Sequence, residues 1–276
     1  MKIAYIHMLA AVSLAAFATP AFAQSDDQQW QGAYIGGTIG VPAQKNDNGE
    51  SVLFDTNRDG TFGDTVRTTS GADAFSPGFC GGAANGRTPA EGCRSDKDGI
   101  EYNIRAGYDM QKGNVVYGVV LEGGTSDARD SVTAFSTTPA FYTFTREIDY
   151  TLGARLRVGY AAGGALFYAT GGGAYAKIKN NFATSNTANS FANNGNTTSL
   201  GYAAGGGAEV KVTKKISLGL EYLYSNYSKD KYRVNVGPGT AAPTNPFLLV
   251  SGGTDFRRSD RDFAMHNIRV TAAYRF

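Results

Sequence analysis

The sequence lacks an excess of charge of one sign and has no cluster of basic residues. Its 276 residues include 26 lysines and arginines against 24 aspartates and glutamates, which gives a formal net charge of +2. Nucleic acid is therefore not indicated as a partner. The composition also lacks the bias of a disordered or collagen-like chain. These absences leave a folded chain of one large domain or two small ones.

Long apolar runs are missing after the first residues of the chain. The N-terminus has a positive start at Lys2, an apolar stretch from Ile3 to Phe17, and a small-residue site ending at Ala23. This pattern predicts a signal peptide, residues 1–23, that is cleaved after Ala23. A retained membrane helix is the weaker alternative, because the segment is short, rich in alanine and followed by polar residues. No later stretch approaches the ~18 apolar residues that a membrane helix needs.

Cysteine is scarce, with Cys80 and Cys93 the only two in the chain. Two cysteines this close in an exported protein most simply form one disulfide. A metal site would need more ligands, and the segment between them offers only Glu91.

Helical periodicity is nearly absent, and apolar residues recur instead at every second position. In residues 100–109, Ile, Tyr and Ala alternate with Glu, Asn, Arg, Gly and Asp. The same alternation predicts eight strands in all. They lie, in chain order, in AYIGGTIG, IEYNIRAGYD, VYGVVLEG, IDYTLGARLRVGY, ALFYATGGGAY, YAAGGGAEV, ISLGLEYLY and NIRVTAAYRF. Which side chains of the fifth strand face inward stays open.

Long and short connections alternate strictly between these strands. The short ones are QKGN, AAGG and TKK, and the long ones are Val41 to Lys97, Thr125 to Arg146, Asn180 to Thr198, and Lys229 to Arg261. This order is typical of an up-and-down, antiparallel transmembrane β-barrel with long outer loops and short periplasmic turns. We expect an all-β fold in which residues 24–276 form one eight-stranded barrel domain with both ends in the periplasm.

A soluble eight-stranded β-barrel with an apolar interior would show the same alternation. The residue types in the polar row of each strand distinguish it from a membrane barrel. That row holds Gly, Ala, Thr and Asn, which suit the crowded interior of an eight-stranded barrel. The other row is Ile, Leu, Val and Tyr without charge, as lipid requires. Tyr150 and Tyr160 lie ten residues apart on that face, which spans about 25 Å of membrane thickness in a tilted strand. The pattern therefore favours a membrane barrel.

The segments GAYIGGTIG, VYGVVLEG and YATGGGAYA, with the closing VTAAYRF, resemble the small bacterial outer-membrane β-barrel proteins of the opacity and outer-membrane-protein-A type. The resemblance spans nearly the whole predicted mature chain. It implies export through the secretory pathway to the outer membrane of a Gram-negative bacterium. It also implies that Tyr274 and Phe276 belong to the signal read by the barrel-assembly machinery. With no segment after Phe276 for a peptidoglycan-binding domain, the chain resembles the barrel-only members, also called a porin family.

Ionisable residues are spaced along the polar rows, and inside a narrow barrel they must pair because a lone buried charge is very costly. One interpretation is a salt-bridged plug that holds the barrel rigid. The alternative is a network that gates a thin ion path by switching partners. The four acids and four bases are Glu101, Glu122, Glu209, Glu221, Arg105, Arg155, Arg157 and Arg269.

The segment DTNRDGTFGD opens like a calcium loop, with Asp55, Asn57 and Asp59 at alternate positions and a glycine at the sixth. Val66 occupies the twelfth position, where a calcium loop has an acidic ligand, so Asp64 would have to supply that ligand instead. An Asp/Asn/Gly turn is the stronger interpretation. We otherwise expect no cofactor, with weak calcium binding in the first outer loop as the alternative.

Catalysis is not indicated, because the predicted mature chain has a single histidine, His266, in the lipid-facing phase. A Ser–His–acid site would need a histidine aimed at a nucleophile. The sequence thus predicts a monomeric structural or surface-interaction protein that presents four outer loops and contributes to outer-membrane integrity. Its expected partners are lipid, lipopolysaccharide and an unknown extracellular ligand. The alternative function is a narrow ion or small-solute pore.

Overall fold

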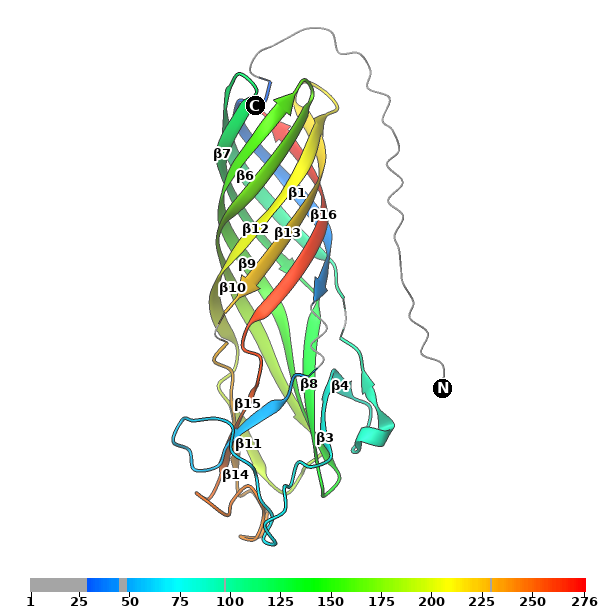
Figure 1. Cartoon of the computed structure of the whole chain (residues 1–276), viewed down its shortest axis with the longest axis vertical. Coiled ribbons are helices and arrows are strands. Elements are labelled where there is room, and N and C mark those ends of the chain that lie inside the picture. The colour runs from blue at the N-terminus through cyan, green and yellow to red at the C-terminus, as the bar shows by residue number, and fades with distance from the viewer. Residues whose placement is uncertain (1–28, 45–48, 97, 229) are drawn as a thin grey trace.

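The computed structural model describes residues 29–44, 49–96, 98–228 and 230–276. The predicted signal peptide lies outside these residues. Within them the chain forms sixteen strands and one 3-10 helix, η1 (Pro89–Glu91). No helix of this part is long and apolar enough to cross a membrane. Eight long strands wind into a barrel, and the eight short strands and η1 lie beyond one of its ends (Figure 1).

All eight predicted strands are present, and they close into a barrel in which every neighbour is antiparallel. Chain order is also the order around the barrel, and β1 pairs with β16 to close the sheet. The barrel strands are β1 (Gly32–Gln44), β6 (Glu101–Lys112), β7 (Val115–Ser126), β9 (Ala140–Ala162), β10 (Ala165–Thr184), β12 (Thr197–Lys211), β13 (Ile216–Tyr227) and β16 (Phe263–Arg275).

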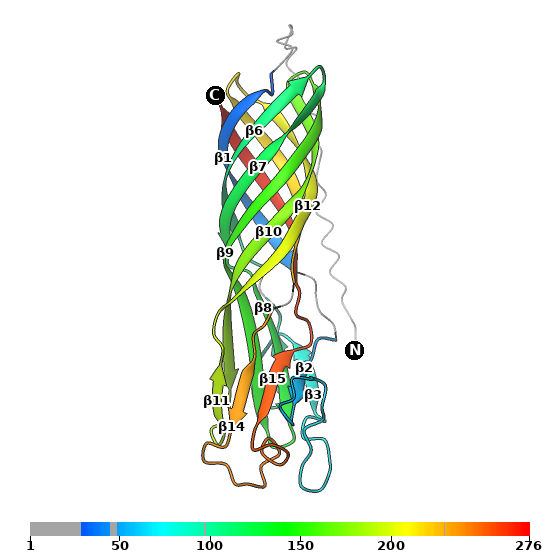
Figure 2. The same cartoon turned by 90° about the vertical axis from the view of Figure 1, so that its left-hand side faces the viewer.

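Short turns join the strands at one end only. The β6–β7 and β9–β10 turns contain two residues each, and they begin at Gly113 and Gly163, whose φ angles are +58° and +59°. Two-residue hairpins need this left-handed conformation, which glycine adopts without steric cost. The start of β1 and the end of β16 lie at this short-turn end (Figures 1 and 2).

Side chains alternate strictly between the two faces of the barrel wall. Outward residues such as Ile104 and Leu200 are 77% and 75% exposed, whereas their neighbours Asn103 and Ser199 are buried. The fifth barrel strand, β10, faces inward with Leu166, Tyr168 and Thr170. This settles the phase that the sequence left open.

Two strands are much longer than the ten or so residues expected from the sequence. β9 has 23 residues and β10 has 20, and they remain paired from the short turn out to Tyr142 and Thr184. A bulge between Lys177 and Ile178 shifts the register where they leave the barrel. The long connections are therefore folded structure, which we call the cap.

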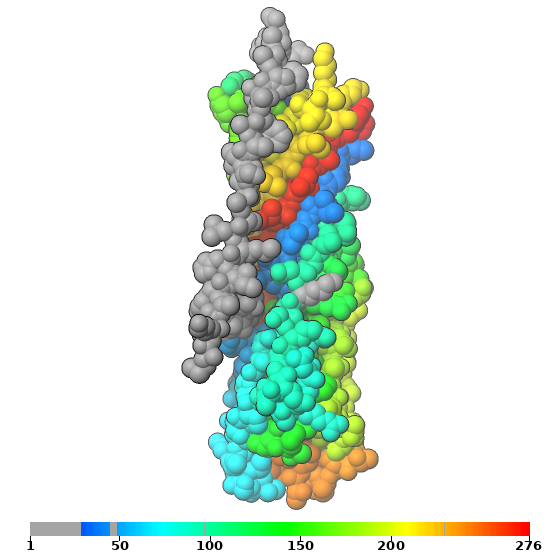
Figure 3. Space-filling view, turned by 90° about the vertical axis from the view of Figure 1, so that its right-hand side faces the viewer, coloured from blue at the N-terminus to red at the C-terminus, as the bar shows by residue number. Residues whose placement is uncertain are grey.

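The cap consists of two small sheets. One is built from β2 (Val52–Asp55), β15 (Thr254–Arg258), β14 (Val234–Gly237) and β11 (Ser190–Asn193). The other extends β9 with β8 (Arg129–Ser136) and β3 (Gly78–Gly81). β4 (Ala83–Ala84) and β5 (Cys93–Arg94) form a minor ribbon in the first connection. Figure 3 shows this connection in cyan along one wall of the cap, with the fourth connection in orange at the tip.

All four long connections contribute to one apolar core between the two sheets. Phe256 is fully buried at its centre, and its ring lies 4.9 Å from Phe54, 5.2 Å from Phe247 and 5.8 Å from Tyr142. The remaining members are Val52, Val66, Ala74, Phe75, Val132, Ala134, Ala140, Phe144, Tyr232, Val234 and Val236, with Phe182 and Phe191 packed against them. Aromatic burial on this scale makes the cap a folded unit.

Replacing Phe256 with alanine should unfold the cap while leaving the barrel intact. Removing a buried phenylalanine costs about 3–5 kcal/mol, and every ring that Phe256 contacts belongs to the cap. Limited proteolysis of the detergent-folded protein should cut the cap of Phe256→Ala faster than that of Val250→Ala, whose side chain is 63% exposed. Both variants should keep the faster migration of the unheated barrel on a detergent gel. Equal protease resistance of the two caps would contradict a shared core.

Candidate functional site

The structure places all eight predicted ionisable residues inside the barrel and joins them to one another. Arg157 pairs with Glu209 at 2.7 Å, and Glu209 also accepts from Arg105 at 3.1 Å. Arg269 pairs with Glu122 at 2.9 Å and with Glu101 at 3.0 Å. The two remaining residues join this chain of contacts, because Arg155 lies 3.1 Å from Glu122 and 3.6 Å from Glu221.

Two further charges belong to the network and were missed from the sequence. Asp109 pairs with Arg157, and Arg275 pairs with Asp109 at 2.9 Å. Both stand in the polar rows of their strands, in phase with Arg105 and Arg269, and this phase is the signal that could have found them. The network then has five arginines and five carboxylates, so its own charges balance.

Trp30 seals the barrel interior at the short-turn end, next to the charge network. It is fully buried among Val116, Ala161, Leu166 and Tyr168. The Arg275 guanidinium lies 4.8 Å from the centre of its ring and donates to its backbone oxygen at 2.8 Å. Because Trp30 precedes the first strand, no periodicity marks it, and this role could not be predicted from the sequence.

An apolar layer covers the other side of the charge network. Nine buried side chains fill the barrel there, and the residues are Ile148, Ala174, Ala176, Ile178, Ala203, Leu223, Tyr227, Phe263 and Met265. Between this layer and the charges lies a cavity of about 20 Å³, lined in part by Glu101, Glu122 and Arg269. That volume holds roughly one water molecule.

A second buried charge cluster ties three of the connections together at the barrel mouth. Arg258 of the fourth connection donates to Glu50 of the first and to Asp130 of the second, each at 2.6 Å. Arg146 also donates to Asp130 at 2.6 Å and reaches the backbone oxygen of Asp262 at 2.8 Å. These bonds fix the base of the cap to the barrel.

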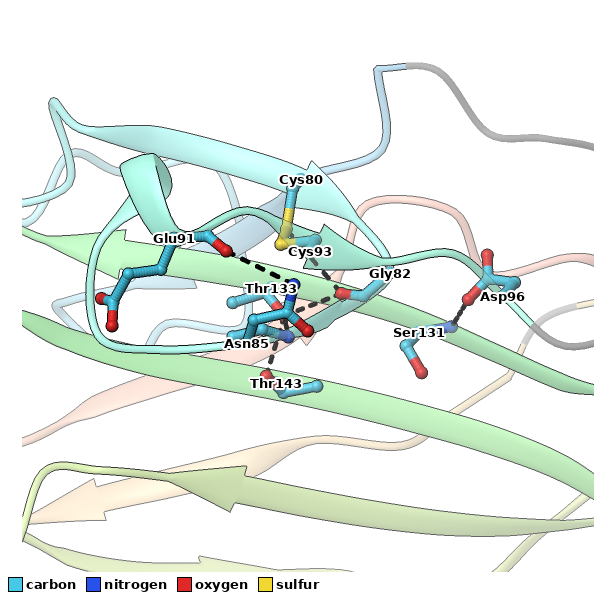
Figure 4. Close-up of a disulfide and its surroundings, with 10 residues drawn as sticks. Cys80, Gly82, Asn85, Glu91, Cys93, Asp96, Ser131, Thr133 and Thr143 are labelled. Atoms are coloured by element: carbon cyan, nitrogen blue, oxygen red, sulfur yellow. Dashed lines mark hydrogen bonds between the residues drawn. A yellow bond between two sulfur atoms is a disulfide. The ribbon is translucent and has the colours of Figure 1, made fainter.

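Asp96 adds a third carboxylate to the edge of this mouth cluster. Its Oδ1 accepts from the backbone N–H of Ser131 on β8 at 2.7 Å (Figure 4). Burial, and then the nearby Asp130 carboxylate, raise the pKa of Asp96 to about 6. Burial also raises the pKa of Glu50, and the positive charge of Arg258 opposes this rise. The two arginines thus face three carboxylates, and Asp96 is the one whose charge is least compensated.

The predicted disulfide is formed, and it closes the arm of the first connection that lies on β8. Cys80 on β3 and Cys93 on β5 have their Cα atoms 6.5 Å apart. Between them Gly82 accepts from Thr133 Oγ1 at 2.8 Å (Figure 4). The Gly82 N–H donates to the backbone oxygen of Ser131. Gly82 has φ +125°, and a side chain there would meet the Arg94 carbonyl, so this arm needs glycine at the crossing.

The four residues of the calcium hypothesis form a compact turn. Asp55 accepts from the backbone N–H groups of Asp59 and Gly60, while Asn57 and Asp59 bond to each other. Asp64 accepts from the backbone and hydroxyl of Thr56 instead. In the part of the chain that the structure covers, no group of three or more Asp, Glu, His or Cys residues could hold a metal. Calcium binding at these residues stays a prediction.

The remaining singled-out residues lie on the lipid-facing side of the barrel. His266 bonds through Nδ1 to the Tyr222 hydroxyl at 2.7 Å and lies 5.0 Å from the Tyr224 ring. At the short-turn end Tyr274 and Phe276 contact each other edge to face, and Phe276 is 70% exposed. The role of Tyr274 and Phe276 as an assembly signal stays a prediction.

An apolar outer wall, tyrosines near both ends of that wall and an ion-paired interior together define a transmembrane β-barrel of the outer membrane. The chain belongs to the family described as "Outer membrane protein beta-barrel domain", whose pattern it matches over residues 9–276. The resemblance drawn from the sequence and the expected localisation are thereby confirmed.

Known proteins with similar sequences are also outer-membrane proteins. The chain is 27% identical over 273 residues to the "31 kDa outer-membrane immunogenic protein" of Brucella melitensis, covering 98% of this chain and 93% of that one. It is 29% identical over 159 residues to the "22 kDa outer membrane protein" of Rhizobium leguminosarum, covering 58% and 67%. The crystal structure of OprG from Pseudomonas aeruginosa shares the fold, with a TM-score of 0.51, 12% identity, and coverage of 89% and 97%.

Replacing Arg157 with methionine should destabilise the barrel by about 3 kcal/mol, because it leaves an excess carboxylate in a closed interior. Adding Glu209→Met to the same chain restores the charge balance and should cost less than the sum of the two single changes. Denaturant unfolding in lipid vesicles measures these differences. Lys179→Met, on the exposed side of β10, is the matched control and should change stability little. Strict additivity of Arg157→Met and Glu209→Met would contradict a coupled network.

Raising the pH should loosen the arm of the first connection on β8. The folded pKa of Asp96 is raised above its ordinary value, so its contribution to docking is complete below about pH 4. That contribution is lost as the pH rises through about 6. Hydrogen exchange, corrected for intrinsic rates, should show lower protection of the Gly82 and Ser131 amides at pH 7.5 than at pH 4.5. Asp96→Asn should remove this difference, and a difference that persists in the variant would rule out Asp96 as its origin.

Proposed function

We propose that this protein is a structural outer-membrane barrel whose role is to present the cap as one rigid surface outside the cell. The observation that carries this proposal is the shared apolar core, to which all four long connections contribute. Loops joined through a common core hold fixed positions relative to one another. A fixed surface of this kind suits recognition by an extracellular partner and pays less ordering entropy on binding than mobile loops would.

The contents of the barrel support a structural role for the membrane part. From the short-turn end outward, the interior holds the Trp30 seal, the balanced charge network, the apolar layer and the mouth cluster. Each layer occupies the width of an eight-stranded barrel, whose interior has room for little more than side chains. The ion pairs link opposite walls and so add rigidity to the sheet.

A narrow pore is the second candidate, and one observation favours it. Several buried polar atoms next to the network have no hydrogen-bond partner among the described residues, including Asn267 Oδ1, Thr271 Oγ1 and Arg155 Nη1. Such groups are usually satisfied by buried water. A file of water through the charged layer would carry ions only if the apolar layer and the Trp30 seal also opened.

The purified protein should therefore show no swelling of liposomes in sugar solutions and no steady conductance in planar bilayers. A sixteen-stranded porin in the same vesicles provides the positive control. On intact cells, added protease should cut the cap and leave the barrel. Steady ion conductance would replace the structural proposal with the pore, and cleavage only after lysis would contradict an outward cap.

A further inference from the structure

A group of arginines lies on the outer face of the cap, outside every site described above. β14 and β15 run side by side along the long axis of the molecule (Figure 2), with Val234 opposite Phe256 in the core-facing row. Arg233 directly precedes β14, and Arg257 follows Phe256 on β15, so both belong to the row that faces away from the core. Arg261 follows four residues after Arg257, where the chain returns to the barrel. We call these three residues the arginine patch.

No guanidinium group of the arginine patch forms an ion pair with any of the described residues. Arg257 and Arg261 are half-buried and Arg233 is exposed. Like charges at neighbouring positions of adjacent strands destabilise a sheet. Consistent with this crowding, burial, and then the charges of Arg261 and Arg233, lower the pKa of Arg257. The sheet thus carries an electrostatic cost that a bound anion would remove.

The guanidinium group of Arg257 is positioned to bind such an anion. Its guanidinium lies 4.5 Å from the centre of the Phe62 ring of the first connection, a cation–π contact that fixes its plane. Its Nε is buried and has no hydrogen-bond partner in the described structure. A planar guanidinium with unused donors suits the paired oxygens of phosphate or carboxylate.

Three acids lie close to the patch in the sequence, and in the described structure none of them forms an ion pair with its guanidinium groups. Asp255 bonds to Asn235 and lies 3.6 Å from Arg58. Asp230 accepts from the Thr197 hydroxyl and the Tyr232 backbone N–H. Asp260 accepts from the backbone N–H of Asp262.

The height of the patch identifies the source of the anion. Arg261 lies five residues from His266, whose contacts with Tyr222 and Tyr224 belong to the aromatic belt at the cap end of the barrel. Five extended residues span at most ~17 Å. Because β14 and β15 run along the long axis, the patch faces sideways over the membrane surface. With the cap outside the cell, the groups beside the patch would be the saccharide headgroups of the outer leaflet.

We propose that the arginine patch binds the anionic groups, phosphate or carboxylate, of the saccharide headgroup of neighbouring lipopolysaccharide. The inference rests on the outward cap of the proposed function. It gives that cap a lateral lipid partner in addition to any ligand at its tip. Binding would fasten the base of the cap to the leaflet in which the barrel sits.

The test measures binding of purified lipopolysaccharide to the detergent-folded protein. The triple variant Arg233→Gln, Arg257→Gln, Arg261→Gln should bind at least tenfold more weakly than the unchanged chain. The matched control is Arg67→Gln, Arg87→Gln, Arg94→Gln, which removes the same charge from exposed positions of the first connection and should bind normally. Arg257→Lys alone keeps the positive charge but loses the paired N–H donors of the guanidinium group, and it should weaken binding severalfold.

The remaining measurements separate lipopolysaccharide binding from misfolding and from binding of free phosphate. Both triple variants should keep the gel shift of the folded barrel. Arg233→Gln alone, at an exposed position, should already weaken binding. Inorganic phosphate that competes at equal concentration would assign the site to free phosphate and overturn the lipid proposal. Equal binding by the two triple variants would also overturn it. Binding in detergent does not depend on orientation in the cell, so failure here is distinct from failure of the protease test on cells.

Discussion

Every backbone N–H and C=O in the membrane-spanning part must find a partner within the protein, because lipid offers none. The antiparallel pairing of β1 with β16 meets this constraint by removing both edges of the sheet. Closure with only eight strands then fixes a narrow interior. The width of that interior decides which side chains fit, and it forces every inward charge against another. The paired arginines and carboxylates are therefore a consequence of closure.

Much of the barrel could be predicted from the sequence because one physical rule governs it. A two-residue period places Ile104 in lipid and Arg105 inside, and a register slip of one residue would exchange them at great cost. The same rule covers Asp109 and Arg275, which stand in the correct phase. It fails for glycine- and alanine-rich β10, where both faces accept small residues, so the inward direction of Tyr168 needed the structure.

The cap could not be predicted, for a different reason. Its strands β2, β11, β14 and β15 have four or five residues each, too few for a period to stand out. Its core takes a few apolar residues from each connection, so no single segment shows a hydrophobic face. Phe54 and Phe256 pair directly, yet about 200 residues separate them in the chain. Trp30 escaped prediction in the same way, since its burial depends on residues from distant strands.

The closed barrel also explains how such distant segments can pair. Gln44 at the end of β1 lies opposite Met265 of β16. Val52 follows Gln44 by eight residues, and its partner Arg258 precedes Met265 by seven. Once the barrel has closed, pairing of β2 with β15 closes a loop of about 15 residues, whereas in the open chain the loop would be about 200. The logarithmic dependence of closure entropy on loop length makes this difference about 2 kcal/mol. The cap sheet should therefore form after the barrel. Its formation depends on barrel closure, whereas barrel closure does not depend on the cap.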